Sequence, residues 1–285
     1  MANLFKKAAV ITDIHLGLKS NSQVHNEDCW EFIKWMVEKA REENCETCFF
    51  LGDFHNNRAS INVLTLSYSL RCLEHLNANF DRIYFIPGNH DLYYRDKRDV
   101  QSVAWAKHLP NVEICNDWTS KDDVVITPWL VGDDHKKIPK LSGRYMFGHF
   151  ELPRFKMNAM VEMPDHGLLN ATHFSNQQQV FSGHFHKRQN TGKIWYIGNA
   201  FPHNYADAWD DDRGMMFWKP GETPEFMPFP EAPRYRTLGL SQVVSNPEKF
   251  IDNKTFAKIT IELEAEYEDI NFIRELLEHD LCARE

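Results

Sequence analysis

The chain has 285 residues, of which 42% are hydrophobic and 26% charged, and its formal net charge is −9. This length and composition are ordinary for a soluble globular protein with one large domain and a small appendage, and no apolar run is long enough to span a bilayer. The acidic balance argues against a protein that binds nucleic acid through overall charge, so a polyanionic substrate would need local positive charge such as bound metal.

The first residues do not form a complete signal peptide, because Asp13 interrupts their apolar run after a few positions. The cysteines have no disulfide framework, which fits a reducing compartment. Cys45 and Cys48 form a single CxxC motif without the second pair that a tetrahedral zinc site needs, and we interpret both as structural. We therefore expect a cytoplasmic protein, in the host cytoplasm if the chain is encoded by a phage.

Residues 8–12 are a short apolar run rich in β-branched residues, which predicts a buried strand leading into Asp13 and His15. On extended backbone these two side chains point the same way and can reach one ion. Helical spacing of apolar residues predicts a helix over about 25–44. The next strand, at 47–51, leads to Asp53, and a right-handed crossover between the strands brings Asp53 near Asp13.

A second helix is predicted over much of 61–76, followed by a strand at 82–85 that leads into Asn89, His90 and Asp91. The amide oxygen can ligate a hard cation, the imidazole can exchange a proton near neutral pH, and the carboxylate can fix which ring nitrogen carries that proton. Three consecutive strands thus end in ligand-type residues. The carboxyl edge of an open α/β sheet is where functional sites are found.

The second half of the chain loses helical spacing and contains further apolar runs. They predict strands at 112–115, 124–130, 145–149, 179–183, 194–197 and 215–218. Imidazoles again stand at strand ends, at His149, His184 and His186. We expect the last two runs to complete a second sheet, which gives two packed sheets flanked by helices. Residues 152–178 have no clear period and are a candidate functional loop.

The clearest change in composition is at residues 220–233, where five prolines predict an edge segment or a stiff connector. A strand at 258–263 and a helix at 269–279 follow it. These two elements make only a thin core, so this tail must pack on the main domain, on a partner, or on both.

The strand-end residues follow the order D-x-H, G-D, G-N-H-D, G-H and G-H-x-H between about residues 10 and 190. Each fragment alone is weak, but their joint occurrence after apolar runs is specific. This order resembles that of the calcineurin-like metallophosphoesterases. Within them the chain resembles the SbcD nuclease family, and its T-even phage branch in particular. That resemblance is carried by Thr12-Asp13-Ile14-His15-Leu16-Gly17, Gly148-His149-Phe150-Glu151-Leu152, Ser182-Gly183-His184-Phe185-His186 and Tyr196-Ile197-Gly198-Asn199.

The resemblance implies an α/β fold, the four-layer α/β/β/α sandwich, with a nuclease domain at 1–232 and a partial accessory or capping α+β domain at 233–285. It also implies a two-metal site in which Asp53 is shared. One ion would be held by Asp13, His15, Asp53 and His186, and the other by Asp53, Asn89, His149 and His184. His90 would be a catalytic imidazole that does not bind metal, oriented by Asp91. The mixed nitrogen and oxygen ligands suit Mn²⁺, Fe²⁺ or Zn²⁺ better than Ca²⁺. The resemblance implies Mn²⁺, with Mg²⁺, Fe²⁺ and Zn²⁺ as alternatives.

The function implied by the resemblance is a DNA exo- and endonuclease that acts in recombination or double-strand-break end processing. The expected partners are DNA, an SbcC-like coiled-coil ABC ATPase and a second copy of the chain, bound through the nuclease domain. Substrate contacts are expected from Asn56, Arg58, Tyr94, Arg95, Lys187 and Arg188. One alternative is a stand-alone phosphoesterase for a small nucleotide or other phosphodiester, which a closed pocket formed by 152–178 would favour. A non-catalytic scaffold is the third hypothesis.

The chain departs from the family pattern at one site position. Much of the family has a histidine shortly after the G-D aspartate, where this chain has Asn56, with His55 one residue earlier. Three other histidines flank the site loops, at His166, His173 and His203. We interpret them as structural, because the implied metal shells are complete without them.

Overall fold

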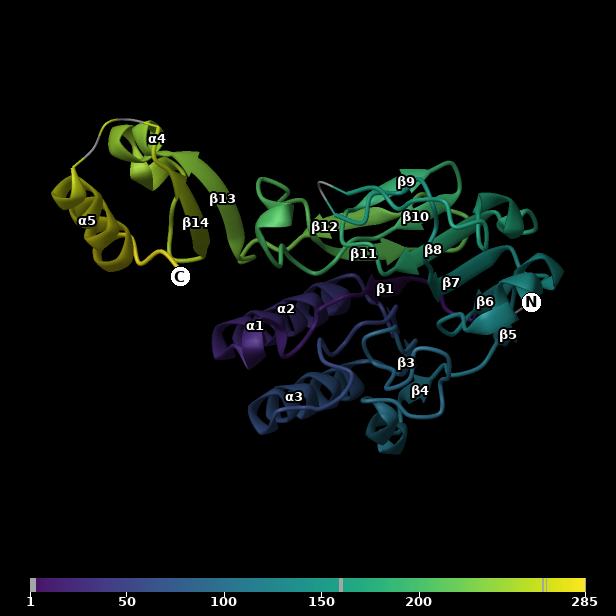
Figure 1. The fold of residues 1–285 in the computed structure, drawn as a ribbon. Helices are drawn as coiled ribbons and strands as arrows, with labels where there is room; N and C mark the ends of the chain where they lie inside the picture. The colour runs from purple at the N-terminus through teal and green to yellow at the C-terminus, as the bar shows by residue number, and fades with distance from the viewer. Residues whose placement is uncertain (1–3, 159–160, 263, 265, 285) are drawn as a thin grey trace.

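The computed structural model describes residues 4–158, 161–262, 264 and 266–284. Two six-stranded sheets form the main body, and a two-stranded sheet lies in a separate C-terminal unit (Figure 1). In spatial order, the first sheet consists of β12 (Glu225–Pro228), β11 (Gly214–Trp218), β1 (Ala8–Ile11), β2 (Thr47–Phe50), β3 (Arg82–Phe85) and β4 (Val112–Ile114). The second consists of β5 (Thr119–Lys121), β6 (Val124–Ile126), β7 (Tyr145–His149), β8 (Gln179–Gly183), β10 (Ile194–Tyr196) and β9 (Gln189–Thr191).

Two long helices connect the first three strands, as the sequence predicts. Helix α2 (Gln23–Glu42) begins after Ser22, whose side chain accepts a hydrogen bond from the His25 N–H, and α3 (Val63–Asn79) begins after Asn62, which caps the Leu64 N–H. A short turn, α1 (Leu18–Asn21), precedes α2. Within the described residues, no helix combines the length and the apolar character that a membrane span requires.

Strands β1 to β4 are parallel and in register, with Ala9 opposite Cys48 and Cys48 opposite Ile83. Their carboxyl ends therefore meet at one edge of the sheet. Strand β11 corrects one prediction, because it does not join the second sheet but pairs antiparallel with β1 in the first. Alternating hydrophobicity predicts a strand but does not identify its neighbour. Strand β12, in the proline-rich segment, is the predicted edge strand.

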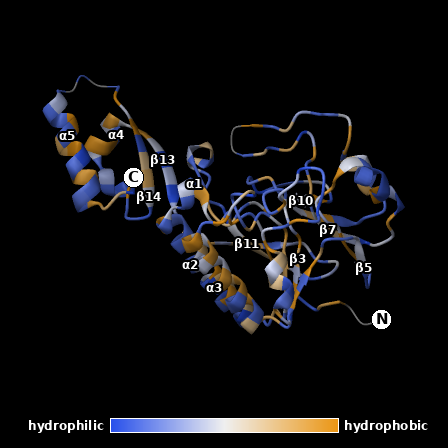
Figure 2. Ribbon diagram, turned by 60° about the horizontal axis from the view of Figure 1, so that its bottom comes forward, coloured by the Kyte–Doolittle hydropathy of each residue, from blue (hydrophilic) through white to orange (hydrophobic). Residues whose placement is uncertain are grey.

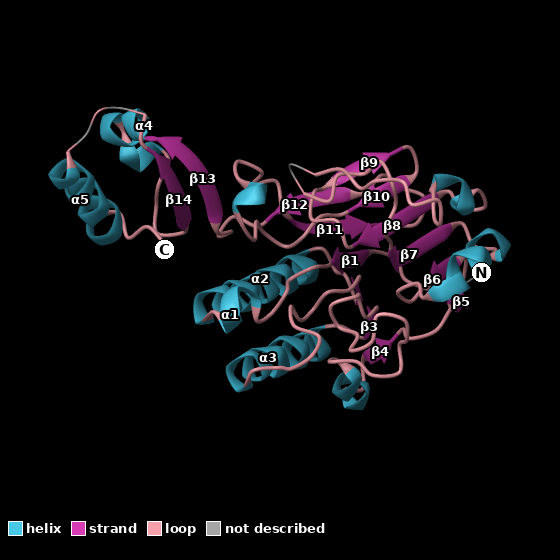
Figure 3. Ribbon diagram, in the orientation of Figure 1, coloured by secondary structure: helices cyan, strands magenta, loops and turns pink. Residues whose placement is uncertain are grey.

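The two large sheets pack face to face through an aromatic core. Phe49 of β2 stacks on Phe147 of β7 with ring centroids 4.0 Å apart, and Trp218 of β11 contacts Phe147. Helices α2 and α3 cover the outer face of the first sheet, against side chains such as Phe50 and Phe85. On the outer face of the second sheet, the cover consists of loops and the 3₁₀ helices η2 (Gly132–Lys140) and η3 (Ala171–Phe174) (Figure 3). The α/β class with two packed sheets is thus confirmed.

The C-terminal unit begins just after the predicted boundary at residue 232. Its parallel strands β13 (Arg234–Gly239) and β14 (Thr255–Thr260) are accompanied by α4 (Leu240–Ser245) and α5 (Tyr267–Glu275), which continues into a π-helical turn at Leu276–Asp280. The predicted strand at 258–263 extends past β14, and its residue Leu263 lies outside the described residues. Figure 2 shows hydrophobic residues on both β14 and α5, which pack together around Leu238, Val243 and Leu277.

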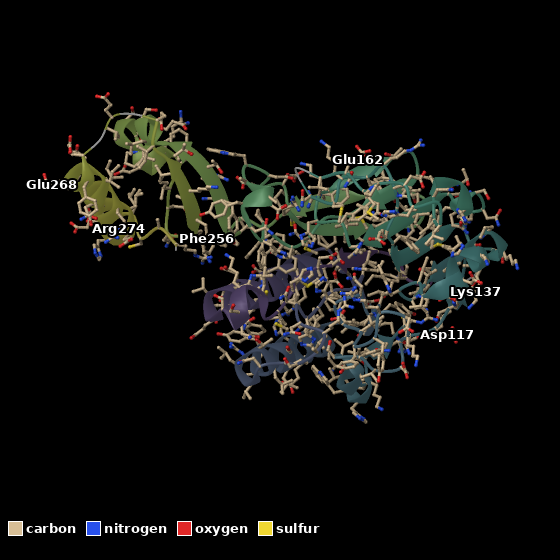
Figure 4. The ribbon with its side chains drawn as sticks, viewed as in Figure 1. Asp117, Lys137, Glu162, Phe256, Glu268 and Arg274 are labelled. Carbon is tan, nitrogen blue, oxygen red and sulfur yellow. The ribbon has the colours of Figure 1, made fainter. Side chains whose placement is uncertain are left out.

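The tail packs on the main body, as its thin core predicts. Arg284 forms a two-pronged ion pair with the buried Asp28 of α2, at 2.6 and 3.0 Å, and Lys254 reaches the same carboxylate at 3.3 Å. The Lys19 ammonium lies over the ring of Phe256, which Figure 4 labels at the side of the tail that faces the main body. Strand β13, which the sequence did not predict, connects the tail to the proline-rich segment.

Candidate metal centre

Loops at the carboxyl ends of five strands bring the predicted metal ligands into one cluster. Asp13 and His15 follow β1, Asp53 follows β2, and Asn89 follows β3. His149 is the last residue of β7, and His184 and His186 follow β8. Contacts of 4.0 Å or less join the side chains of all seven. The carboxyl edges of both sheets therefore supply one site.

Four of these residues have a left-handed backbone: Asp13, His15, Asp53 and His184 have φ values of 52°, 49°, 57° and 84°. The predicted extended backbone at Asp13 and His15 is therefore wrong. Their side chains converge through a turn that follows the strand. Hydrogen bonds from the Asp13 and His15 N–H groups to the carbonyls of Gly52 and Asp53 hold this turn against the loop after β2. Unfavourable φ values of this kind cluster at functional sites.

One half of the cluster is formed by Asp13, His15 and His186. The Nε2 atoms of the two imidazoles lie 3.2 Å apart, and Oδ1 of Asp13 lies 3.7 Å from His15 and 4.0 Å from His186. The other carboxylate oxygen, Oδ2, accepts hydrogen bonds from the Thr12 hydroxyl and the His184 N–H. Asp13 is thus held in place by Oδ2 and presents Oδ1 to the imidazoles.

The other half is formed by Asn89, His149 and His184. Oδ1 of Asn89 lies 3.2 Å from His149 Nε2 and 3.0 Å from His184 Nδ1. Asp53 stands between the two halves, because its Oδ2 is 3.7 Å from His15 Nε2 and 3.5 Å from His149 Nε2. Its other oxygen accepts the His90 N–H. This is the arrangement expected of a carboxylate shared by two ions.

Opposite charges shift the pKa values of this buried cluster. Burial favours the neutral carboxylic acid at Asp53, but the interactions with His149, His15 and His90 together outweigh burial and hold the pKa of Asp53 well below its usual value. Burial likewise lowers the pKa of His149, but its interactions with Asp53, Asp13 and the Leu51 carbonyl together raise it to about 9. Burial raises the pKa of Asp13, but the nearby imidazoles of His15, His149 and His186 together outweigh burial and lower it. The carboxylates are therefore anionic at neutral pH and suited to cations.

Several polar atoms in the cluster are buried without a hydrogen-bond partner among the described residues. They are Oδ1 of Asp13, Nδ1 of His15 and Nε2 of His184. Buried polar atoms are normally satisfied, and groups left over at a site point to an ion or water. Together with the mixed imidazole, amide and carboxylate donors, these atoms fit divalent metal ions. Three-residue groups within ligand distance occur on both sides of Asp53.

His90 lies beside the cluster, but Asp91 does not orient it. The His90 Nδ1 is 2.7 Å from the carbonyl oxygen of Asn56, which leaves Nε2 for other partners. Asp91 is fully buried and accepts hydrogen bonds from the N–H groups of Phe54, His55 and Gly88. The prediction that Asp91 fixes the imidazole is therefore wrong. Instead, Asp91 joins the loops after β2 and β3, and burial raises its pKa to about 6.

His55 does not replace the family histidine at the site. Its ring nitrogens lie 2.8 Å from the hydroxyls of Ser69 and Ser102, so it is a satisfied core residue, and burial lowers its pKa to about 4. The Asn56 side chain, in contrast, lines the site cavity together with His90. Of the two candidates for that position, Asn56 is therefore the one that lines the site cavity.

The predicted substrate contacts fall into two groups. In the first group, Arg58 lies near enough to His90 for its charge to lower the pKa of that imidazole, although burial lowers that pKa more. Tyr94 and Arg95 are exposed on the loop after Asp91. Lys187 and Arg188, however, are engaged in ion pairs, each at 2.7 Å, with Asp210 and Asp212. These pairs reduce the positive charge available to a phosphate there, because acidic residues far along the chain neutralise it.

Sequence reasoning interprets His203 as a structural residue near the site, but in the structure it lies directly against His15 and His186, with ring centroids 5.3 and 5.1 Å away. Sequence reasoning missed the fully buried Arg213. That guanidinium donates hydrogen bonds to the His186 carbonyl and to the side chains of Asn199, Asp207 and Asp210. Arg213 stands in a polar segment before β11, without a local motif that would single it out.

Two cavities open at the cluster. One, of about 280 Å³, is lined by ligand residues together with Asn56, His90, Met157 and His203. The other, of about 250 Å³, is reached past His149 and is lined by Trp129 and by Met163 to Leu169 of the predicted functional loop. Residues 159 and 160 of that loop lie outside the described residues. The described part of the loop therefore forms one wall of the site. It is tied to the site by the Met157 carbonyl, which accepts the His186 N–H.

A model of the family described as calcineurin-like phosphoesterase matches residues 6–199, which contain all seven predicted ligands. Among curated proteins, the chain is similar to exonuclease subunit 1 of Enterobacteria phage T4. The two are 27% identical over 227 residues, which cover 76% of this chain and 66% of that subunit. The chain thus spans slightly less than two thirds of the length of that relative.

Among solved structures, the chain is similar to a nuclease, MPE, from Pseudomonas putida. Sequence identity is 17%, 66% of each chain is covered, and the TM-score is 0.34. It is also similar to a dimetal phosphatase from Danio rerio, with 12% identity, coverage of 76% of this chain and 93% of that chain, and a TM-score of 0.45.

Proposed function

Because this chain belongs to the calcineurin-like phosphoesterase family, we propose that it is a DNA nuclease that hydrolyses phosphodiester bonds with two divalent metal ions. Membership itself makes it a metal-dependent hydrolase. The observation that carries the proposal is the position of Asp53 between two groups of donors, where its Oδ2 lies 3.7 Å from His15 and 3.5 Å from His149. DNA as substrate is supported by the similarity to a phage exonuclease subunit.

When bound, two such ions would lower the pKa of a water molecule and stabilise the charge that grows in an in-line displacement. Asp13, His15 and His186 would hold one, and Asn89, His149 and His184 the other, with Asp53 shared. We propose Mn²⁺ as the metal, with Fe²⁺ and Zn²⁺ as alternatives, because the donors combine carboxylate and amide oxygens with imidazoles and include no thiolate.

His90 is proposed as the acid that protonates the leaving sugar oxygen. Its Nδ1–H donates to the Asn56 carbonyl, which fixes the ring and directs Nε2 away from that loop. Burial lowers the pKa of His90, which makes its protonated form a stronger acid. The leaving alkoxide is strongly basic, so a proton delivered from Nε2 favours bond cleavage.

The test uses the full chain and Asp53→Asn, with linear, hairpin and single-stranded DNA and bis(p-nitrophenyl) phosphate as substrates, in Mn²⁺ and in Mg²⁺. Metal content is measured in parallel by elemental analysis. We expect about two ions for each wild-type chain, fewer in Asp53→Asn, and DNA cleavage only with metal present. Cleavage that persists unchanged in chelator, or a chain that binds no divalent ion, would refute the proposal.

A small nucleotide or other phosphodiester is a second candidate substrate. Two observations favour it: the cavity beside Trp129 has a wall formed by the 152–178 loop, and the ion pairs of Lys187 and Arg188 weaken the basic surface near the site. The same assays distinguish the two. Efficient cleavage of a nucleotide diester without cleavage of any of the three DNA substrates would favour the small substrate.

We further propose that an SbcC-like coiled-coil ATPase supplies DNA affinity to this acidic chain, and that the two act in recombination or end processing in the cytoplasm. A second proposal is that the chain forms a homodimer through its nuclease domain. The net charge of −9 supports a borrowed DNA-binding surface. Exposed apolar side chains of the tail, such as Ile261 and Phe272, support a protein partner there. Light scattering of the purified chain, alone and mixed with such an ATPase, tests both proposals.

A further inference from the structure

We infer that His203 is an additional imidazole ligand of the metal ion on the Asp13 side of the site. That half of the centre would then be held by three histidines, His15, His186 and His203, together with Asp13 and the shared Asp53. The inference rests on the proposed metal centre and goes beyond the seven ligands implied by the family resemblance. His203 also lies outside residues 6–199, which the family model matches.

The three imidazoles are arranged as a slightly expanded ligand group. One ring nitrogen from each of His15, His186 and His203 lies within 4.8 Å of the others. Nitrogens bound at tetrahedral angles to one ion at about 2.1 Å are about 3.4 Å apart, so a contraction of at most roughly 1.4 Å brings the group onto one ion. The rings of His15 and His186 stand at 89° and 81° to that of His203. The three side chains therefore approach one point from different directions.

The chemistry of His203 also points to a ligand. It is 2% exposed, and both of its ring nitrogens lack a hydrogen-bond partner among the described residues. Two other buried histidines are satisfied: His25 lies 2.9 Å from the His15 carbonyl, and His55 is placed between two serine hydroxyls. A buried imidazole that is aimed into the site cavity and lacks such partners is what a metal ion would satisfy.

A buried network fixes His203 relative to His186. The backbone N–H of His203 donates a hydrogen bond to Oδ2 of Asp207 at 3.1 Å. The other oxygen of that carboxylate, Oδ1, accepts a hydrogen bond from the Arg213 guanidinium at 3.3 Å. The same guanidinium donates to the carbonyl oxygen of His186. The Arg213 side chain therefore links the segment that carries His203 to the backbone of His186, one of the seven predicted ligands. Outer partners of this kind orient metal ligands and are costly to remove.

A third imidazole has a consequence for metal choice. Neutral nitrogen ligands suit Mn²⁺, Fe²⁺ and Zn²⁺, whereas Mg²⁺ prefers oxygen ligands and retains water. His203 would therefore make the Asp13 side discriminate against Mg²⁺ more strongly than the Asn89 side, which has two imidazoles and an amide oxygen. The chain would retain Mn²⁺ at this site in an excess of Mg²⁺.

The test is Mn²⁺ binding to the full chain, followed by electron paramagnetic resonance. In the wild type we expect two sites, and pulsed spectra that count three coupled imidazole nitrogens at one site and two at the other. His203→Asn and His203→Leu should weaken one site at least tenfold, remove one nitrogen coupling from it, and reduce its preference for Mn²⁺ over Mg²⁺. His75→Asn, which changes a histidine that packs on Trp30 between the two long helices, is the control and should leave both sites unchanged.

Two imidazole nitrogens at each wild-type site would overturn the inference, and this measurement does not depend on the folding of any variant. Unchanged Mn²⁺ affinities in folded His203→Asn, checked by circular dichroism, would also overturn it and leave His203 as a packing residue. A wild-type chain that binds no Mn²⁺ would instead refute the proposed function itself. The two failures are therefore distinguishable.

Discussion

Replacement of His90 by asparagine is expected to slow DNA cleavage while both metal ions remain bound. The His90 imidazole is held by the Asn56 carbonyl, 2.7 Å from Nδ1, and its ring centroid lies 4.9 Å from that of His15. Asparagine can still donate to that carbonyl through its amide group. It cannot transfer a proton, so the variant removes the proposed acid and keeps the local hydrogen bond.

The size of the loss follows from the role. General acid catalysis contributes roughly 10²–10⁴-fold, which corresponds to about 2.7–5.4 kcal/mol of transition-state stabilisation. Bis(p-nitrophenyl) phosphate has a leaving group that is stable as an anion and needs no proton. For that substrate we expect a loss of at most about tenfold. The ratio of the two losses therefore reports proton donation and not a general defect of the site.

The assay compares kcat on linear DNA and on bis(p-nitrophenyl) phosphate for wild type and His90→Asn, both saturated with Mn²⁺. Equal losses on the two substrates would refute the role of His90 as the acid. Metal content is measured on the same samples, because a His90 ring atom also lies within ligand distance of His15 and Asp53. A variant that retains one ion instead of two would show that His90 is a ligand.

Three further predictions concern the site and its support. A methyl group on Gly88 would lie 2.2 Å from Oδ1 of Asp53, so Gly88→Ala should displace that carboxylate and weaken metal binding at least tenfold in calorimetry. Arg213→Met should lower the free energy of unfolding, measured in urea, by about 3–5 kcal/mol, because the buried Asp207 loses its charged partner. His149, whose pKa is raised to about 9, is protonated at pH 7 and must lose its proton to bind metal. Metal affinity should therefore rise with pH from 6 to 9, with proton release detected by calorimetry in buffers of different ionisation enthalpy.

The sequence predicted the ligand cluster because its signal is local and repeated. Short apolar runs each end in a ligand-type residue, as in β1 before Asp13 and β2 before Asp53, and parallel pairing must bring such ends to one edge. The long helices were also predictable, since their apolar faces repeat at helical spacing. Strand β11 was assigned to the wrong sheet because its hydrophobic pattern carries no information about its neighbour.

The remaining differences arise from contacts between distant segments. His203 follows no strand, so its approach to His15 depends on the path of the loop that Arg213 fixes. Lys187 is neutralised by Asp210, which lies 23 residues later. Adjacency in sequence suggested that Asp91 orients His90, but the turn directs the two side chains to different partners. Local pattern therefore predicted which residues meet, but not which hydrogen bonds they form.

The left-handed backbone at four ligand residues lowers the thermal stability of the protein in exchange for the metal site. These residues are Asp13, His15, Asp53 and His184. Each such residue costs of order 1–2 kcal/mol that glycine would not incur. Variants selected only for heat resistance would accordingly accumulate glycine at these four positions. Their melting temperature would rise while their metal binding was lost. An ion that binds the folded chain offsets this cost, so the loaded protein should tolerate heating that the stripped protein does not.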